Sequence, residues 1–142
     1  MKEIIKPIIN YDGYFISNLG KVYCNIGKGG KGFNRKELYE LKPRLTKKGY
    51  GRIYARNKKA NKRKDLYIHR LVAEYFIPNP KNKKYVNHKD CNRMNNKTNN
   101  LEWCTAKENT LQTEKLNHII RDKRGLFVSN FLNMKNKQYY MV

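Results

Sequence analysis

The chain has 142 residues, enough for one domain with a short appendage, and 32 Lys and Arg against 11 Asp and Glu give a formal net charge of +21. This excess favours a polyanionic partner, DNA or RNA ahead of an anionic membrane surface, because phosphate contacts release condensed counterions. With no long apolar run and no signal-peptide pattern, we expect a cytoplasmic protein with no membrane partner. None of the three cysteines forms a CxxC pair, which excludes a four-thiolate zinc site.

Short strands are predicted for the first third of the chain. Two alternating runs, Tyr14–Asn18 and Leu19–Cys24, meet at a glycine and predict a hairpin. The segment Gly27–Gly32 lacks the GK[ST] ending of a P-loop and is expected to be a charged surface loop. Further strands are predicted over Leu41–Leu45, Tyr50–Arg56 and Leu66–Ile68.

The tip between the last two strands, Asn57–Lys64, is strongly basic. It is either a solvated hairpin end or a finger laid along DNA, and the charge of the whole chain favours DNA contact. The side chains predicted to contact DNA are basic residues of this hairpin and its surroundings: Arg44, Lys48, Arg52, Arg56, Lys58, Lys59, Lys62, Arg63, Arg70 and Lys107. Arginines among them suit guanine edges or paired phosphates.

A helix is predicted next, because apolar residues recur at i, i+3, i+4, i+7 and i+8 from Ile68 to Phe76 and prolines follow at Pro78 and Pro80. The apolar face is interpreted as core. His69, at the start of this helix, is interpreted as a structural histidine.

The segment from Lys81 to Thr113 predicts strand, loop, strand and helix. The strands are Tyr85–His88 and Leu101–Cys104, and the loop between them is rich in asparagine. Thr105 and Glu108 have the spacing of a capping box, so a helix that includes Asn109 is expected to begin there. The asparagines within the loop are interpreted as residues that brace it: Asn92, Asn95, Asn96 and Asn99.

The ββα unit brings together residues suited to phosphodiester hydrolysis. We expect His88, Asn87 and Asn109 to converge on one small site. An imidazole with a pKa of roughly 6.5 is a neutral base near pH 7 and can take a proton from water. One divalent ion, Mg²⁺ or Mn²⁺, prefers oxygen ligands and keeps several waters, so two protein ligands and a phosphate suffice.

Three ordered blocks resemble the HNH endonucleases of the phage and intron homing type: Gly13–Val22, His69–Ala73 and Asn87–Asn109. The first is similar to an N-terminal DNA-binding motif that accompanies such nucleases. The resemblance implies a ββα-metal finger in which His88 is the general base and Asn100 braces the loop and helps to hold His88. It also implies that Asn87 and Asn109 bind the metal.

Three positions depart from the family pattern. Asn109 replaces the histidine that gives the family its last letter, and Asn87 stands where related enzymes can carry aspartate. With two neutral amides, we expect weak metal binding in the absence of DNA. Cys91 stands where a turn glycine is usual, which predicts a strained left-handed turn.

We therefore expect an α+β fold in three parts. These are a small antiparallel β-rich DNA-binding region at residues 1–64, a ββα-metal nuclease domain at 65–115 and a C-terminal helical DNA-contacting tail at 116–142. The expected function is a site-specific homing endonuclease that nicks one strand of double-stranded DNA as a monomer, or forms a weak dimer. It would need no small-molecule cofactor and would be phage-encoded, in the cytoplasm of a bacterial host. The alternatives are a DNA-binding protein without catalysis and, ranked last, an RNA-binding protein.

Overall fold

The structure is a computed structural model that describes residues 1–26 and 34–120. It divides into two units, Met1–Cys104 and Thr105–Val142, which are described separately. Antiparallel sheets and two α-helices place the chain in the predicted α+β class. The predicted loop Gly27–Gly32 and residues 121–142 of the predicted tail lie outside the described residues.

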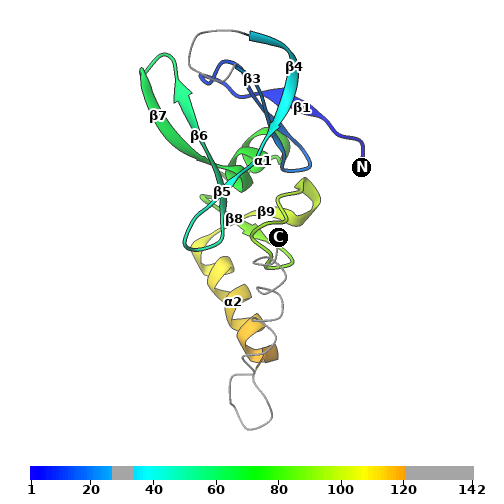
Figure 1. Cartoon of the computed structure of the whole chain (residues 1–142). Coiled ribbons are helices and arrows are strands. Elements are labelled where there is room, and N and C mark those ends of the chain that lie inside the picture. The colour runs from blue at the N-terminus through cyan, green and yellow to red at the C-terminus, as the bar shows by residue number, and fades with distance from the viewer. Residues whose placement is uncertain (27–33, 121–142) are drawn as a thin grey trace. The chain divides into compact units, whose positions relative to one another are not determined.

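The first sheet contains β1 (Ile5–Pro7), β2 (Tyr14–Ser17), β3 (Val22–Ile26) and β4 (Asn34–Leu41), in that order and antiparallel (Figure 1). The predicted hairpin is confirmed as β2 and β3. Its turn contains Gly20, which has a φ of 79°.

The second sheet consists of β5 (Arg44–Leu45), β6 (Gly51–Asn57) and β7 (Lys62–Tyr67). The strand predicted over Leu41–Leu45 is wrong: Leu41 ends β4, and β5 starts after Pro43, which has no amide hydrogen to donate to a ladder. The strand predicted over Leu66–Ile68 is confirmed at Leu66 and Tyr67, but β7 begins earlier, at Lys62, and Ile68 begins a helix. The predicted boundary between the DNA-binding region, residues 1–64, and the nuclease domain, residues 65–115, lies within β7, and this division of the chain stays a prediction.

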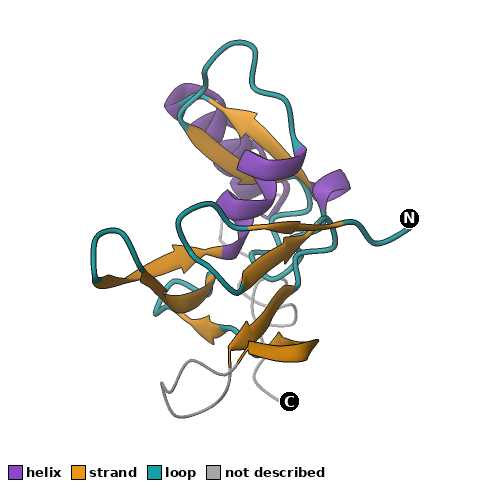
Figure 2. Cartoon of the chain, turned by 90° about the horizontal axis from the view of Figure 1, so that it is seen from above, coloured by secondary structure: helices purple, strands orange, loops and turns teal. Residues whose placement is uncertain are grey.

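Helix α1 (Ile68–Phe76) contributes its apolar face to the hydrophobic core, which confirms the predicted core face of this helix. Its buried residues pack with Ile16 of β2, Ile53 of β6 and Leu101 of the strand β9 (Leu101–Cys104). Ile16, Ile68 and Leu101 are among the largest fully buried side chains. Within residues 1–26 and 34–104, α1 is the one α-helix and most other elements are strands, which Figure 2 colours purple and orange.

The motif segment folds as the predicted hairpin. Strand β8 (Tyr85–His88) pairs antiparallel with β9, and a 3₁₀ turn, η1 (Thr98–Asn100), precedes β9. Cys91 has a φ of 58°, which confirms the predicted left-handed turn.

The second unit begins with a capped helix, α2 (Ala106–Ile120). The Thr105 amide donates to Glu108 Oε2 at 2.7 Å, and the Glu108 amide donates to Thr105 Oγ1 at 3.2 Å, which confirms the predicted capping box. Among the described residues, no helix has the length and apolar character needed to cross a membrane.

Candidate active site

His88 lies at the end of β8 and is 4% exposed. The chain turns sharply after it: the Cys91 amide donates to the His88 carbonyl at 2.9 Å, and the Lys89 amide donates to the Asn100 carbonyl at 2.8 Å. The imidazole is therefore fixed at the junction of a strand and a tight loop.

The side chain of Asn96 holds the ring of His88. His88 Nε2 lies 2.9 Å from Asn96 Oδ1, and Asn96 Nδ2 donates to the Met94 carbonyl at 3.4 Å. Because an amide oxygen only accepts, Nε2 carries the hydrogen in this arrangement. The neutral ring then has its lone pair on Nδ1, which is the atom that can take a proton.

The surroundings of His88 keep its imidazole neutral. Burial lowers the pKa of His88 below its usual range, and the charge of Arg93 lowers it further. The hydrogen bond to Asn96 and the charge of Asp90 act in the opposite direction, but burial is the larger effect. Near pH 7 the ring is therefore a base and not an imidazolium.

Asn100 braces the loop that follows His88. Its Oδ1 accepts from the Asp90 amide at 3.1 Å, and its Nδ2 donates to Asp90 Oδ1 at 2.9 Å and to the Asn95 carbonyl at 2.8 Å. Three bonds from one buried side chain tie both ends of the loop together. Asn96, which holds His88, follows directly after Asn95.

Two rings from outside the ββα unit pack against His88. The ring centroid of His69 lies 5.4 Å from that of His88, and Tyr50 lies 4.9 Å from His69 and 6.2 Å from His88. The guanidinium of Arg93 lies over the Tyr50 ring at 4.9 Å. His69 is 8% exposed, and its Nδ1 has no hydrogen-bond partner among the described residues. Sequence reasoning missed this cluster, because Tyr50 and His69 lie far from His88 along the chain.

The predicted metal ligands are oxygen donors of the kind that Mg²⁺ prefers. Asn87 Nδ2 donates to Glu102 Oε1 at 3.1 Å across the β8–β9 pair, so a carboxylate that was not among the predicted site residues lies beside this amide. Asn109 is an exposed residue of α2 in the second unit. In residues 1–26 and 34–120, three or more His, Cys, Asp or Glu side chains nowhere form a metal-binding group. By its chemistry, an amide oxygen such as that of Asn87 suits Mg²⁺ or Mn²⁺ and not a closed zinc site, whose usual ligands are thiolates and imidazoles.

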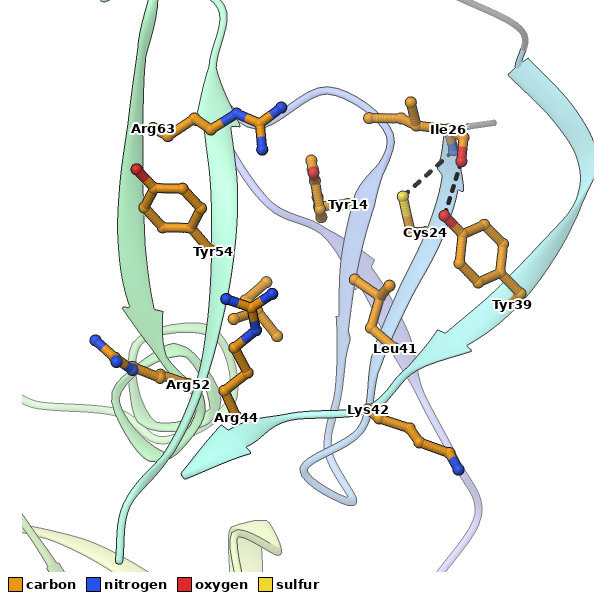
Figure 3. Close-up of a pocket in the computed structure, with 11 residues that line it drawn as sticks. Tyr14, Cys24, Ile26, Tyr39, Leu41, Lys42, Arg44, Arg52, Tyr54 and Arg63 are labelled. Carbon is orange, nitrogen blue, oxygen red and sulfur yellow. Dashed lines mark hydrogen bonds between the residues drawn. The ribbon is translucent and has the colours of Figure 1, made fainter. Parts of the chain in front are cut away.

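A cleft of about 390 Å³ lies between residues of the first and second sheets (Figure 3). Its lining combines basic side chains with tyrosine rings. Figure 3 shows Arg63 extending toward Tyr14, with Arg44 and Tyr54 nearby. Three of the predicted DNA-contacting arginines, Arg44, Arg52 and Arg63, thus line one concave surface.

Some of the predicted DNA-contacting residues, Arg52 of the cleft among them, already have partners within the chain. Arg52 forms an ion pair with Asp65, Arg56 donates to Asn61, and Arg70 donates to the Lys84 carbonyl. Lys58 pairs with Asp12 on the surface. The side chains of Lys48, Lys59, Lys62 and Lys107 are exposed.

The sequence model of the HNH endonuclease family matches residues 66–111. The chain is 39% identical over 105 residues to the DNA endonuclease I-HmuI of Bacillus phage SP01, a match that covers 73% of this chain and 53% of that protein. It is 38% identical over 105 residues to the uncharacterized HNH endonuclease L245 of Acanthamoeba polyphaga mimivirus, over 74% of this chain and 28% of that protein.

A solved structure, described as DNA binding and cleavage by the HNH homing endonuclease I-HmuI, matches with a TM-score of 0.63 and 32% identity. The match covers 94% of this chain and 66% of that one. The chain belongs to the HNH endonuclease family. It spans 28% and 53% of the lengths of the two curated relatives named above.

In this HNH endonuclease domain, the matched segment contains His88, Asn100 and Asn109. The structure brings His88 and the Asn100-braced loop together, with Asn96 as the direct link. The roles of Asn87 and Asn109 as metal ligands stay predictions. A usable signal for Asn96 was its place in the asparagine-rich loop, but four asparagines shared that signal.

Proposed function

We propose that this chain is a metal-dependent DNA endonuclease that hydrolyses phosphodiester bonds of double-stranded DNA, of the site-specific homing type. The observation that carries the proposal is His88, a buried, neutral imidazole whose Nε2 is held by Asn96. The described residues contain one such site, so we expect a monomer to nick one strand. Its relative from a Bacillus phage supports a phage-encoded protein that acts in the bacterial cytoplasm.

In this mechanism, His88 Nδ1 takes a proton from a water molecule as the water oxygen attacks the phosphorus. The bond from phosphorus to the 3′ oxygen breaks, and that oxygen leaves with the electron pair and is protonated from solvent. Asn87 and Asn109 would hold Mg²⁺ or Mn²⁺, whose positive charge would stabilise the negative charge that develops on the phosphate and on the leaving oxygen. Asn96 keeps the hydrogen on Nε2, and Asn100 keeps the loop in place around the base.

The decisive test of this function is cleavage of supercoiled plasmids that carry a randomised insert library, with Mg²⁺, with Mn²⁺ or with EDTA. We expect relaxed circles with either ion and none with EDTA, because the developing phosphate charge then lacks its counter-charge. Linear product at low enzyme concentration would instead show paired active sites. Salt-sensitive binding without cleavage of any library member would refute the nuclease and favour a DNA-binding protein.

The basic cleft between the sheets is proposed to contact DNA phosphates. A double substitution, Arg44→Gln with Arg63→Gln, should weaken DNA binding about tenfold or more and lower the slope of log K against log salt concentration by about two. Lys81→Gln with Lys84→Gln removes the same charge from exposed residues outside the cleft and serves as the control. Fluorescence anisotropy at several salt concentrations measures both quantities. Equal losses in the two double variants would show that net charge alone, and not the cleft, binds DNA.

A further inference from the structure

The turn between β2 and β3, Ser17–Gly20, contacts the segment that holds the active-site histidine. The Thr98 amide donates to the Asn18 carbonyl at 2.9 Å, and Thr98 Oγ1 donates to the same oxygen at 2.7 Å. Thr98 begins the η1 turn, whose last residue is Asn100. Eighty positions separate the two partners along the chain.

Gly20 lies directly against Asn96. A Cβ atom on Gly20 would be 2.7 Å from Asn96 Cβ and 2.8 Å from the Asn96 carbonyl oxygen, and Gly20 has a φ of +79°. Only glycine allows both this conformation and this approach. Asn96 is 6% exposed, so the turn forms one wall of the space in which its side chain reaches His88.

The turn is itself held firmly in place. The Asn18 amide donates to the Ile4 carbonyl at 3.0 Å, Asn18 Oδ1 accepts from the Ile4 amide at 2.8 Å, and Asn18 Nδ2 donates to the Lys2 carbonyl at 3.0 Å. The Gly20 amide donates to the Ser17 carbonyl at 3.0 Å. Because these hydrogen bonds fix the turn, the turn constrains the positions of the residues that contact it.

We propose that the Ser17–Gly20 turn is a positioning element of the active site, which sets the orientation of His88 through Asn96 and anchors η1 through Thr98. The proposal rests on the role of His88 as the base. It gives the N-terminal motif a part in cleavage that is separate from DNA binding. Gly20, Asn18 and Thr98 act through Asn96 and Asn100 and do not touch the substrate.

The first test compares two substitutions of Thr98. Thr98→Val keeps the shape but removes the hydroxyl bond to Asn18, and should lower kcat about fivefold with KM unchanged. Thr98→Ser restores the hydroxyl and should return kcat to within about twofold of the wild type. A loss confined to KM or to thermal stability, or the same loss in both variants, would overturn the proposal.

The second test compares alanine substitutions at two glycines that share the same left-handed backbone conformation. Gly20→Ala should lower kcat about tenfold or more, because the new methyl group displaces Asn96 and with it His88. Gly49→Ala is the matched control, since Gly49 has a φ of +81° and, beyond its own residue and its two chain neighbours, nothing lies within 4 Å of the position that a Cβ would occupy. Equal kcat values for the two variants would contradict the proposed positioning role.

A readout independent of cleavage separates this proposal from the proposed function. The chain has three histidines, so a ¹H–¹³C spectrum of the imidazole groups contains few signals, and the spectrum of the His88→Ala protein assigns the signal of His88. That signal should move in Gly20→Ala and Thr98→Val and stay in place in Gly49→Ala. If the wild-type protein cuts no DNA, the proposed function fails while this comparison still decides the positioning role. Unchanged His88 signals in both test variants would overturn it.

Discussion

Substitution of His88 by alanine is expected to lower the rate of DNA cleavage about 10³-fold and to leave DNA affinity within about twofold of the wild type. The imidazole is the proposed acceptor of the proton from water. Its Nε2 is held by Asn96, so the substitution removes the base without removing any basic residue of the cleft. Cleavage and binding should therefore separate.

The measurement is single-turnover cleavage of a target plasmid at saturating enzyme, beside fluorescence anisotropy on the same DNA. Added imidazole should restore part of the lost rate, because the cavity left by the side chain can admit a free base. A Glu102→Gln variant tests the neighbouring carboxylate separately from the base. It keeps a hydrogen-bond acceptor for Asn87 and removes the carboxylate beside this proposed metal ligand. A His88→Ala protein that cuts DNA at the wild-type rate would exclude this residue as the base.

The parts of the fold that the sequence predicted depend on local patterns. The apolar spacing from Ile68 to Phe76 defines α1, because one face of a helix is set by residues three and four apart. The capping box at Thr105 and Glu108 is equally local. The β8–β9 hairpin followed from two short strands that flank a polar loop.

Strands defined by their partners were harder to predict. Four of the six residues of β7 are charged, and the strand exists because it pairs with β6, where Ile53 and Ala55 are buried. An isolated Lys62–Asp65 segment contains no apolar alternation, so its strand could not be read from the segment itself. Pro43 similarly separates β4 from β5, although the apolar residues Leu41 and Leu45 had suggested one continuous strand.

The candidate site divides in the same way. His88 and Asn100 were predicted because the motif spacing places them, whereas Asn96 could not be distinguished from the other loop asparagines. Its contact with His88 depends on the left-handed turn at Cys91 and on the close approach of Gly20. His69 comes from α1 and Tyr50 directly precedes β6, and only tertiary packing brings these two rings to the site.

Acid is expected to destabilise the folded protein through His69. Burial, followed by the charges of His88 and Arg70, lowers the pKa of His69 to about 4. In the unfolded chain the pKa is about 6.5, so between these values the unfolded state binds more protons than the folded state. The free energy of unfolding therefore falls as the pH drops below about 6.5, and the loss contributed by this one group approaches about 3 kcal/mol near pH 4.

His69→Phe should remove that contribution. The variant keeps an aromatic ring beside Tyr50 and Tyr67 and eliminates the buried Nδ1 that has no partner among the described residues. Between pH 7 and pH 4.5, urea unfolding should show a loss of stability roughly 2 kcal/mol smaller in the variant than in the wild type. Lys59→Gln, a change at an exposed position, controls for net charge and should keep the wild-type pH dependence.

The two histidines of the cluster make this measurement informative about the site. Burial lowers the pKa of His88 as well, so protonation of either ring in the folded state places a charge beside the other. A His69→Phe protein with an unchanged pH dependence would mean that His88 alone accounts for the acid sensitivity, or that the cluster opens to water before either ring is protonated. A reduced dependence would show that His69 stays neutral in the folded protein, so that no positive charge on this ring lies beside the proposed base.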